Sequence, residues 1–135
     1  MSVVWVACAI IEHQGQVLAA RRKKHHSQGG LWEFPGGKLN QGETPEQCLI
    51  REIMEELGAN IRIVARLPDC LYHYPALSVC LMPFVCQAEQ AAIFQAIEHD
   101  AIQWCTKEEL LGLDWCPADV PVLQQYLAWK SAKKI

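Results

Sequence analysis

The sequence predicts an α+β fold, an α/β/α sandwich in which helices cover both faces of a central mixed β-sheet. Two observations predict it. Apolar runs of strand length outnumber helical patterns, and the long helical patterns lie far apart in the chain. The composition, with 51% apolar and 20% charged residues among 135, is that of a globular protein. This length fits a single domain spanning residues 1–135.

Composition and charge exclude several classes of protein. The balance of 12 basic against 15 acidic residues gives a net charge of −3, which argues against a dedicated nucleic-acid binder. The longest apolar run, Val3–Ile11, is far shorter than the ~20 residues of a membrane helix and lacks a basic leader. The seven cysteines include no CxxC pair and are expected to be reduced core residues. We therefore expect a cytoplasmic protein with no membrane, nucleic-acid or obligate protein partner.

The first third of the chain predicts a β-hairpin followed by a basic loop. Val3–Ile11 and Val17–Ala20 have strand character and flank a Gln-Gly turn. Residues 21–26, Arg-Arg-Lys-Lys-His-His, are typical of a solvated loop. Residues 31–34 then form an extended segment that enters a tight turn at residues 35–37, Pro-Gly-Gly.

The clearest predicted element is a helix over Pro45–Leu57. Thr44 is its expected N-cap, proline occupies the first helical position, and Gln47 completes a capping box. Gly58 stands where helices commonly end in a left-handed residue. Both ends of this helix are therefore predicted from local signals alone.

The second half of the chain predicts further strands and two helices. The expected strands are Ile61–Leu67, Leu77–Cys86 and Ala101–Cys105, and Pro83 suggests an edge or a bulge in the second. A second capping box at residues 106–109 opens a short helix that ends near Gly112. Val120, Leu123 and Leu127 have helical spacing, so an amphipathic helix is expected over Val120–Lys130.

Three acids share one face of the predicted helix over residues 45–57. At about 100° per residue, Glu52, Glu55 and Glu56 span an arc of about 100°. An apolar stripe lies beside them and contains Leu49, Ile50, Ile53 and Leu57. Like charges at this spacing repel, which a divalent cation such as Mg²⁺ or Mn²⁺ would offset. A solvated acidic face remains the alternative interpretation.

The segment before this helix strengthens the metal interpretation. Gly36 and Gly37 allow a close approach that a side chain would block. Residues 37–59 contain Gly37, Glu43, Arg51 and then Glu-Ile-Met-Glu-Glu-Leu-Gly-Ala, and they resemble the Nudix box G-x5-E-x7-R-E-U-x-E-E-x-G-U. Ala59 is the one departure, since the pattern has a bulkier aliphatic residue there. Residues 31–38 and 115–123 also resemble the MutT-like branch of the Nudix hydrolases.

The resemblance implies a Nudix fold and a set of metal ligands. These are the carbonyl of Gly36 and the carboxylates of Glu52, Glu55, Glu56 and Glu98, although Asp100 competes for the place of Glu98. Mg²⁺ is the implied cofactor, with Mn²⁺ as a substitute. Glu52 is the first candidate for the catalytic base, and Glu55 and Glu98 are alternatives. Glu43 and Arg51 are expected to brace the loop against the helix.

The same resemblance suggests substrate-binding residues. Arg22 and Lys38 are candidates to contact the triphosphate, and Phe34 and Asp119 are candidates to recognise the base. Asp119 also stands where the last helix would take an N-cap, a frequent role for aspartate. The two interpretations of Asp119 predict different contacts.

The expected activity is pyrophosphohydrolysis of a nucleoside triphosphate, which releases a monophosphate and pyrophosphate. Sanitisation of oxidised nucleotides such as 8-oxo-dGTP is the first expectation. Hydrolysis of CTP, dCTP or a modified pyrimidine triphosphate is the alternative. A non-catalytic nucleotide sensor is a third interpretation, but a sensor would not need the complete set of acids that the box retains.

Overall fold

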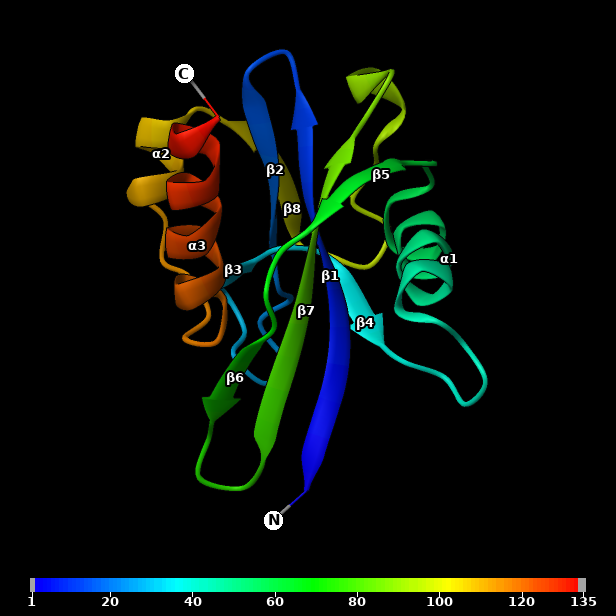
Figure 1. The fold of residues 1–135 in the computed structure, drawn as a ribbon, viewed down its shortest axis with the longest axis vertical. Helices are drawn as coiled ribbons and strands as arrows, with labels where there is room; N and C mark the ends of the chain where they lie inside the picture. Colours follow the sequence, from blue (N-terminus) through cyan, green and yellow to red (C-terminus); the bar gives the residue numbers. More distant parts are fainter. Residues whose placement is uncertain (1, 134–135) are drawn as a thin grey trace.

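The computed structural model describes residues 2–133 and contains an eight-stranded mixed sheet (Figure 1). Its longest strands, β1 (Val3–His13) and β7 (Ser78–Gln87), run parallel to each other at the centre. The remaining strands are β2 (Gln16–Arg21), β3 (Trp32–Glu33), β4 (Gly36–Lys38), β5 (Arg62–Arg66), β6 (Cys70–His73) and β8 (Ala101–Cys105). The main path runs β3-β2-β1-β7-β5, while β4 pairs with β1, β6 with β7, and β8 with β2.

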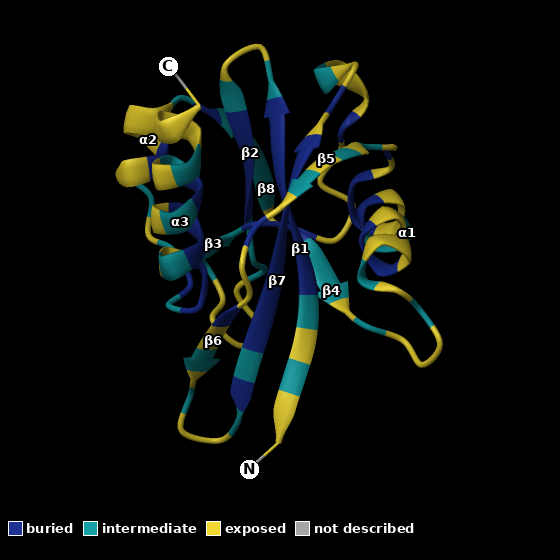
Figure 2. Cartoon of the chain, in the orientation of Figure 1, coloured by how far each residue is buried: buried dark blue, intermediate teal, exposed yellow. Residues whose placement is uncertain are grey.

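Helices cover both faces of this sheet, as the sequence predicts. The helix α1 (Pro45–Leu57) lies on one side, and α2 (Lys107–Leu111) and α3 (Asp119–Ala132) lie on the other (Figure 1). A short 3₁₀ helix, η1 (Ala91–Ile93), precedes β8. The buried residues form two clusters, one beneath α1 and one beneath α2 and α3, with the sheet between them (Figure 2). This is an α/β/α sandwich.

The alternation of side chains along the central strands builds both clusters. In β1, Ala7, Ala9 and Ile11 pack towards α1, while Cys8 and Ile10 pack towards α3. Successive residues of a strand point to opposite faces, so a strand covered on both sides reads as a continuous apolar run. All seven cysteines are buried and unpaired, as the sequence predicts.

Local signals fix α1 as predicted. Thr44 accepts a hydrogen bond from the Gln47 amide at 3.1 Å, and the Gln47 side chain accepts one from the Thr44 amide at 3.0 Å. Gly58 ends the helix in the left-handed region at φ 67°. The second capping box, on Thr106 and Glu109, likewise opens α2.

Two local predictions are wrong and one strand is missed, each for reasons of tertiary structure. Pro83 lies in an interior strand and not at an edge or bulge, because its missing N–H falls where the neighbour of β7 changes from β6 to β5. Gly36 and Gly37, expected in a tight turn over residues 35–37, instead pair with β1 as part of strand β4. Strand β6 is not predicted at all, because apolar and polar residues alternate only weakly along the Cys70–His73 sequence.

The predicted helix faces also need correction. Ile50, which is expected in the apolar stripe, is exposed, whereas Cys48 is buried. In α3 the buried side chains are Asp119, Val122, Leu123 and Tyr126, whereas Val120 is exposed. Among residues 2–133, no helix has both the length and the apolar character required to span a membrane.

Candidate active site

The acidic face of α1 is held by an arginine on the same helix. Arg51 donates to Glu43 through Nε at 2.6 Å and Nη2 at 3.0 Å. Its Nη1 donates to Glu52 Oε1 at 3.0 Å and to Glu55 Oε1 at 3.2 Å. Hydrogen bonds from Arg51 and the Asn40 amide lower the pKa of Glu43 to about 2. The brace that the sequence predicts between loop and helix is therefore present.

The two glycines of β4 are required by close approach. A Cβ on Gly37 would lie 2.2 Å from the Glu52 carboxyl carbon, and a Cβ on Gly36 would lie 1.9 Å from the Ala7 carbonyl oxygen. Only glycine lets β4 lie against both β1 and the acidic face of α1. The backbone at Gly37 is thus brought against the Glu52 carboxylate.

Glu56 is the buried member of the acidic face. Burial raises its pKa to about 10, and a hydrogen bond and charge repulsion from Glu52 act in the same direction. The charges of Glu33 and Glu98 add to the shift. Four carboxylates from α1, β3 and the loop before β8 therefore converge, and such a group is stable in its ionised form only with a compensating cation.

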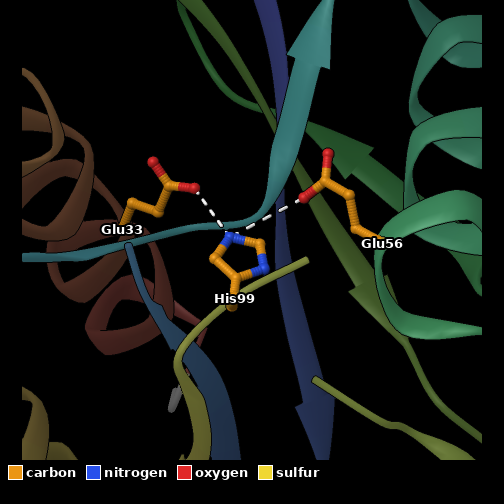
Figure 3. A group of neighbouring side chains, drawn as sticks. All are labelled: Glu33, Glu56 and His99. Atoms are coloured by element: carbon orange, nitrogen blue, oxygen red, sulfur yellow. Dashed lines mark hydrogen bonds and ion pairs between the residues drawn. The ribbon is translucent and has the colours of Figure 1, made fainter. Parts of the chain in front are cut away.

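Two residues of this cluster are absent from the sequence-based site, Glu33 and His99. His99 Nε2 lies 2.8 Å from Glu33 Oε2 and 3.8 Å from Glu56 Oε1. The two carboxylates approach the imidazole from opposite sides (Figure 3). Their ligand atoms all lie within 4.8 Å of one another. Their only sequence signal is position, and it is weak: Glu33 directly precedes the Phe-Pro-Gly-Gly segment, and His99 directly follows the candidate Glu98.

The other acids predicted for the site differ in their surroundings. Glu98 is exposed, but its negative charge contributes to the raised pKa of Glu56. Asp100, its competitor, forms an ion pair with Arg21 at 3.2 Å instead. The Glu55 side chain is half exposed and pairs with Arg51 one turn earlier in the helix.

The predicted phosphate contacts are split between two places. Arg22 points to Glu33, with Nη1 at 3.0 Å from Oε1, and its Nε donates to the Ser27 carbonyl. Its neighbours Arg21, Lys23 and Lys24 line a hollow of about 680 Å³ together with His25, Gly30, His99 and Asp100. Lys38 is exposed on β4, apart from this hollow. The hollow was not predicted, and its basic lining suits an anion.

Phe34 and Asp119 are brought together, but in the interior. The Phe34 amide donates to Asp119 Oδ2 at 2.9 Å, and the Phe34 ring lies 4.7 Å from the Trp115 ring. Ala118 and not Asp119 is the N-cap of α3, so the capping interpretation is wrong. Burial and the charge of Glu33 raise the pKa of Asp119 well above its usual value, and Arg22 opposes the shift.

This donor set fits a divalent cation. The neighbouring Glu52 carboxylate helps to raise the pKa of Glu56, and Gly37 leaves room for the Glu52 carboxylate beside β4. Carboxylate and carbonyl oxygens are the ligands that Mg²⁺ and Mn²⁺ prefer.

Comparisons with known proteins find relatives along nearly the whole chain. The family model of the NUDIX domain matches residues 1–133. The chain is 35% identical to the CTP pyrophosphohydrolase of Escherichia coli over 98% of both chains. It is 39% identical to the 8-oxo-dGTP diphosphatase of Proteus vulgaris, over 59% of this chain and 72% of that one. The solution structure of the E. coli ORF135 protein superposes with a TM-score of 0.83 at 34% identity, over 99% of this chain and 95% of that one.

Proposed function

Because the chain belongs to the Nudix family and is a hydrolase of nucleotide phosphoanhydrides, we propose that it hydrolyses pyrimidine nucleoside triphosphates, CTP or dCTP foremost. The proposed products are a nucleoside monophosphate and pyrophosphate. The observation that carries the proposal is the match to a CTP pyrophosphohydrolase over 98% of both chains. The match to an 8-oxo-dGTP diphosphatase covers only 59% of this chain. The pyrimidine alternative is therefore favoured over the oxidised purine that the sequence put first.

The proposed metal ligands are the carboxylates of Glu52, Glu55, Glu56 and Glu98 and the carbonyl of Gly36. Their support is the convergence of charge on Glu56 and the contact of Gly37 with Glu52. When bound, Mg²⁺ or Mn²⁺ would offset the charge of the triphosphate and polarise the attacked phosphoryl group. We keep Glu52 as the first candidate for the base, with Glu55 and Glu98 as alternatives. Arg51 donates a hydrogen bond to Glu52 Oε1, so we propose that Oε2 accepts the proton of the attacking water.

The proposed triphosphate site is the basic hollow beside His99. Arg21 at the end of β2 lines it together with Lys23 and Lys24 of the loop that begins at Arg22. Arg22 acts there through Glu33, which it holds with a 3.0 Å ion pair. Lys38, exposed on β4, supplies a further cation to the approaching anion.

The proposed base site involves Phe34 and Asp119. The hydrogen bond from the Phe34 amide uses Asp119 Oδ2, and we assign Oδ1 to the base. Cytosine carries an exocyclic amino group, which donates to a carboxyl oxygen. Uracil has a carbonyl at the same position, so this contact favours a cytosine nucleotide.

A substrate screen tests the proposal directly. The purified protein is incubated with Mg²⁺ and CTP, dCTP, UTP, dGTP or 8-oxo-dGTP in turn, and released pyrophosphate is measured. We expect the highest kcat/KM for CTP or dCTP and no turnover in excess chelator. A preference for 8-oxo-dGTP would restore the oxidised-purine interpretation. Orthophosphate as the first product would contradict pyrophosphohydrolysis.

A further inference from the structure

His99 lies between the acidic face of α1 and strand β3, which leads to Phe34 of the candidate base site. Among the described residues, His99, Glu33 and Glu56 form the one cluster whose ligand atoms could hold a metal ion. Its side chain is 6% exposed, and it comes from the loop between the exposed Glu98 and β8. On one side it meets Glu33 of β3, and on the other Glu56 of α1 (Figure 3).

The contact with Glu33 fixes the proton on the imidazole. An ionised carboxylate only accepts hydrogen bonds, so the 2.8 Å contact requires that Nε2 carry the hydrogen. In the tautomer whose single hydrogen is on Nε2, Nδ1 carries a lone pair. That nitrogen is buried and has no hydrogen-bond partner among the described residues. Nε2 is thus a donor to a carboxylate rather than a free ligand atom.

This arrangement argues against metal ligation by His99 through Nε2. A histidine that binds a metal through one nitrogen almost always donates its other ring N–H to a protein group. Ligation through Nε2 would place the hydrogen on Nδ1, where the described chain offers no acceptor. A buried donor without a partner is costly, whereas the observed hydrogen bond to Glu33 has no such cost.

The hydrogen bond belongs to a chain of four side chains. Arg22 Nη1 lies 3.0 Å from Glu33 Oε1, and Glu33 Oε2 lies 2.8 Å from His99 Nε2. The same Nε2 lies 3.8 Å from Glu56 Oε1. Both oxygens of Glu33 are therefore engaged, one by the basic loop and one by the imidazole. Glu33 cannot turn towards Glu56 while both contacts hold.

We propose that His99 is a positioning residue whose Nε2–H holds Glu33 away from Glu56 and faces the Glu56 carboxylate, so that Glu56 is kept in place for the metal ion. This inference rests on the proposed function, because it assumes that Glu56 binds a divalent cation. It assigns to His99 no metal bond through Nε2, although the imidazole also lines the basic hollow proposed for the triphosphate. The loss of such a contact to a metal-binding carboxylate typically weakens metal binding about 10- to 100-fold.

Two amide substitutions separate this role from its alternatives. In His99→Gln the amide N–H reaches about the position of Nε2, whereas in His99→Asn the side chain is one methylene shorter and does not. His26→Ala removes an exposed histidine of the basic loop and is the matched control. Mn²⁺ affinity without nucleotide is measured from the electron paramagnetic resonance signal of free Mn²⁺, and folding is followed by circular dichroism melting. CTP hydrolysis gives kcat and KM for each variant.

We expect His99→Asn to raise the Mn²⁺ dissociation constant about 10-fold or more. His99→Gln is expected to stay within about threefold of the wild-type value, and His26→Ala to match it. An equal loss in the Gln and Asn variants would identify His99 as a metal ligand and overturn the proposal. An unchanged dissociation constant in both, with or without a lower melting temperature, would overturn it in favour of a purely structural role. Wild-type protein that hydrolyses no nucleoside triphosphate would overturn the proposed function, whichever Mn²⁺ affinities the variants have.

Discussion

Arg51 and Glu43 are joined side by side, with Nε 2.6 Å from Oε2 and Nη2 3.0 Å from Oε1. A paired contact of this kind fixes orientation as well as distance, because the planar guanidinium matches the two carboxylate oxygens. Glu43 also accepts from the Asn40 amide at 2.9 Å. The loop between β4 and α1 is therefore tied to the second turn of α1, beside the acids that the proposed metal ion needs.

This contact predicts a specific loss of stability in acid. The pKa of Glu43 is lowered from 4.5 to about 2, so its contribution is present above pH 4.5 and is lost as pH falls towards 2. The difference in unfolding free energy between wild type and Glu43→Gln should be largest near neutral pH and should vanish near pH 2. Urea unfolding across this range measures it. Glu89→Gln, which removes an exposed acid, controls for the loss of one charge. A difference that stays constant with pH would contradict the prediction.

Glu56→Gln should separate stability from activity. The pKa of Glu56 is raised from 4.5 to about 10, so the metal-free protein loses stability as pH rises through this window. Glutamine carries no charge, and the variant's melting temperature without metal should exceed the wild-type value increasingly with pH. Turnover should fall at least ~10²-fold, the scale of losing a major transition-state stabiliser. Turnover near the wild-type rate at saturating Mg²⁺ would remove Glu56 from the metal site.

Glu55→Gln tests the exposed acid of the same face. Its side chain is half exposed and pairs with Arg51 at i,i+4, so the substitution should change stability by no more than about 0.5 kcal/mol. Turnover should nevertheless fall at least ~10²-fold if Glu55 binds the metal ion. Glu46→Gln, an exposed acid in the first turn of α1, should keep wild-type turnover. If Glu55→Gln and Glu46→Gln had equal kcat values, the role of Glu55 would be limited to its ion pair with Arg51.

The sequence predicts those parts of the site that depend on neighbours in the chain. The bounds of α1 follow from Thr44, Gln47 and Gly58, whose effects are local, and the acidic face follows from helical periodicity. The layers follow from the apolar patterns of β1, β7 and α1. Each of these signals is contained in a short window of sequence.

The parts that the sequence does not predict depend on contacts between distant residues. Glu33 and His99 are 66 positions apart, and nothing in either segment alone marks them as a pair. Pro83 is tolerated in an interior strand only because two different strands flank β7 on one side. Asp119 has the residue type of an N-cap, but the Phe34 amide, 85 positions earlier, takes its carboxylate.

Glu98 and Asp100 provide a matched pair of exposed acids in one loop. Glu98 acts electrostatically on Glu56, whereas Asp100 pairs with Arg21 at 3.2 Å on the basic hollow. Glu98→Gln should therefore lower kcat by about 10- to 10²-fold and weaken Mn²⁺ binding. Asp100→Asn should change the KM for the nucleotide and leave kcat and Mn²⁺ affinity unchanged. Steady-state kinetics and Mn²⁺ titration of both variants test these expectations. If Asp100→Asn alone lowered kcat, Asp100 and not Glu98 would be the metal ligand.

The last prediction concerns the choice of base. In Asp119→Asn the amide oxygen can still accept from the Phe34 amide, so the 2.9 Å hydrogen bond and the start of α3 should survive. The substitution replaces the other carboxyl oxygen with an NH₂ group, which donates and cannot accept. That group opposes the amino group of cytosine and suits the carbonyl of uracil, so the ratio of kcat/KM for CTP to that for UTP should fall. A contact of ~1–3 kcal/mol corresponds to a change of roughly 5- to 150-fold in this ratio.

The exposed Asp114 provides the control for this substitution, since Asp114→Asn makes the same chemical change five residues before the start of α3. Its CTP-to-UTP ratio should stay within about twofold of the wild-type value, because the substitution changes only an exposed side chain and keeps the Asp114 carbonyl that accepts from the Trp32 amide. If Asp119→Asn keeps its melting temperature and also keeps the wild-type ratio, Asp119 does not contact the base. Its buried carboxyl then serves only to anchor β3 to α3 through Phe34, and the preference for cytosine must come from another residue.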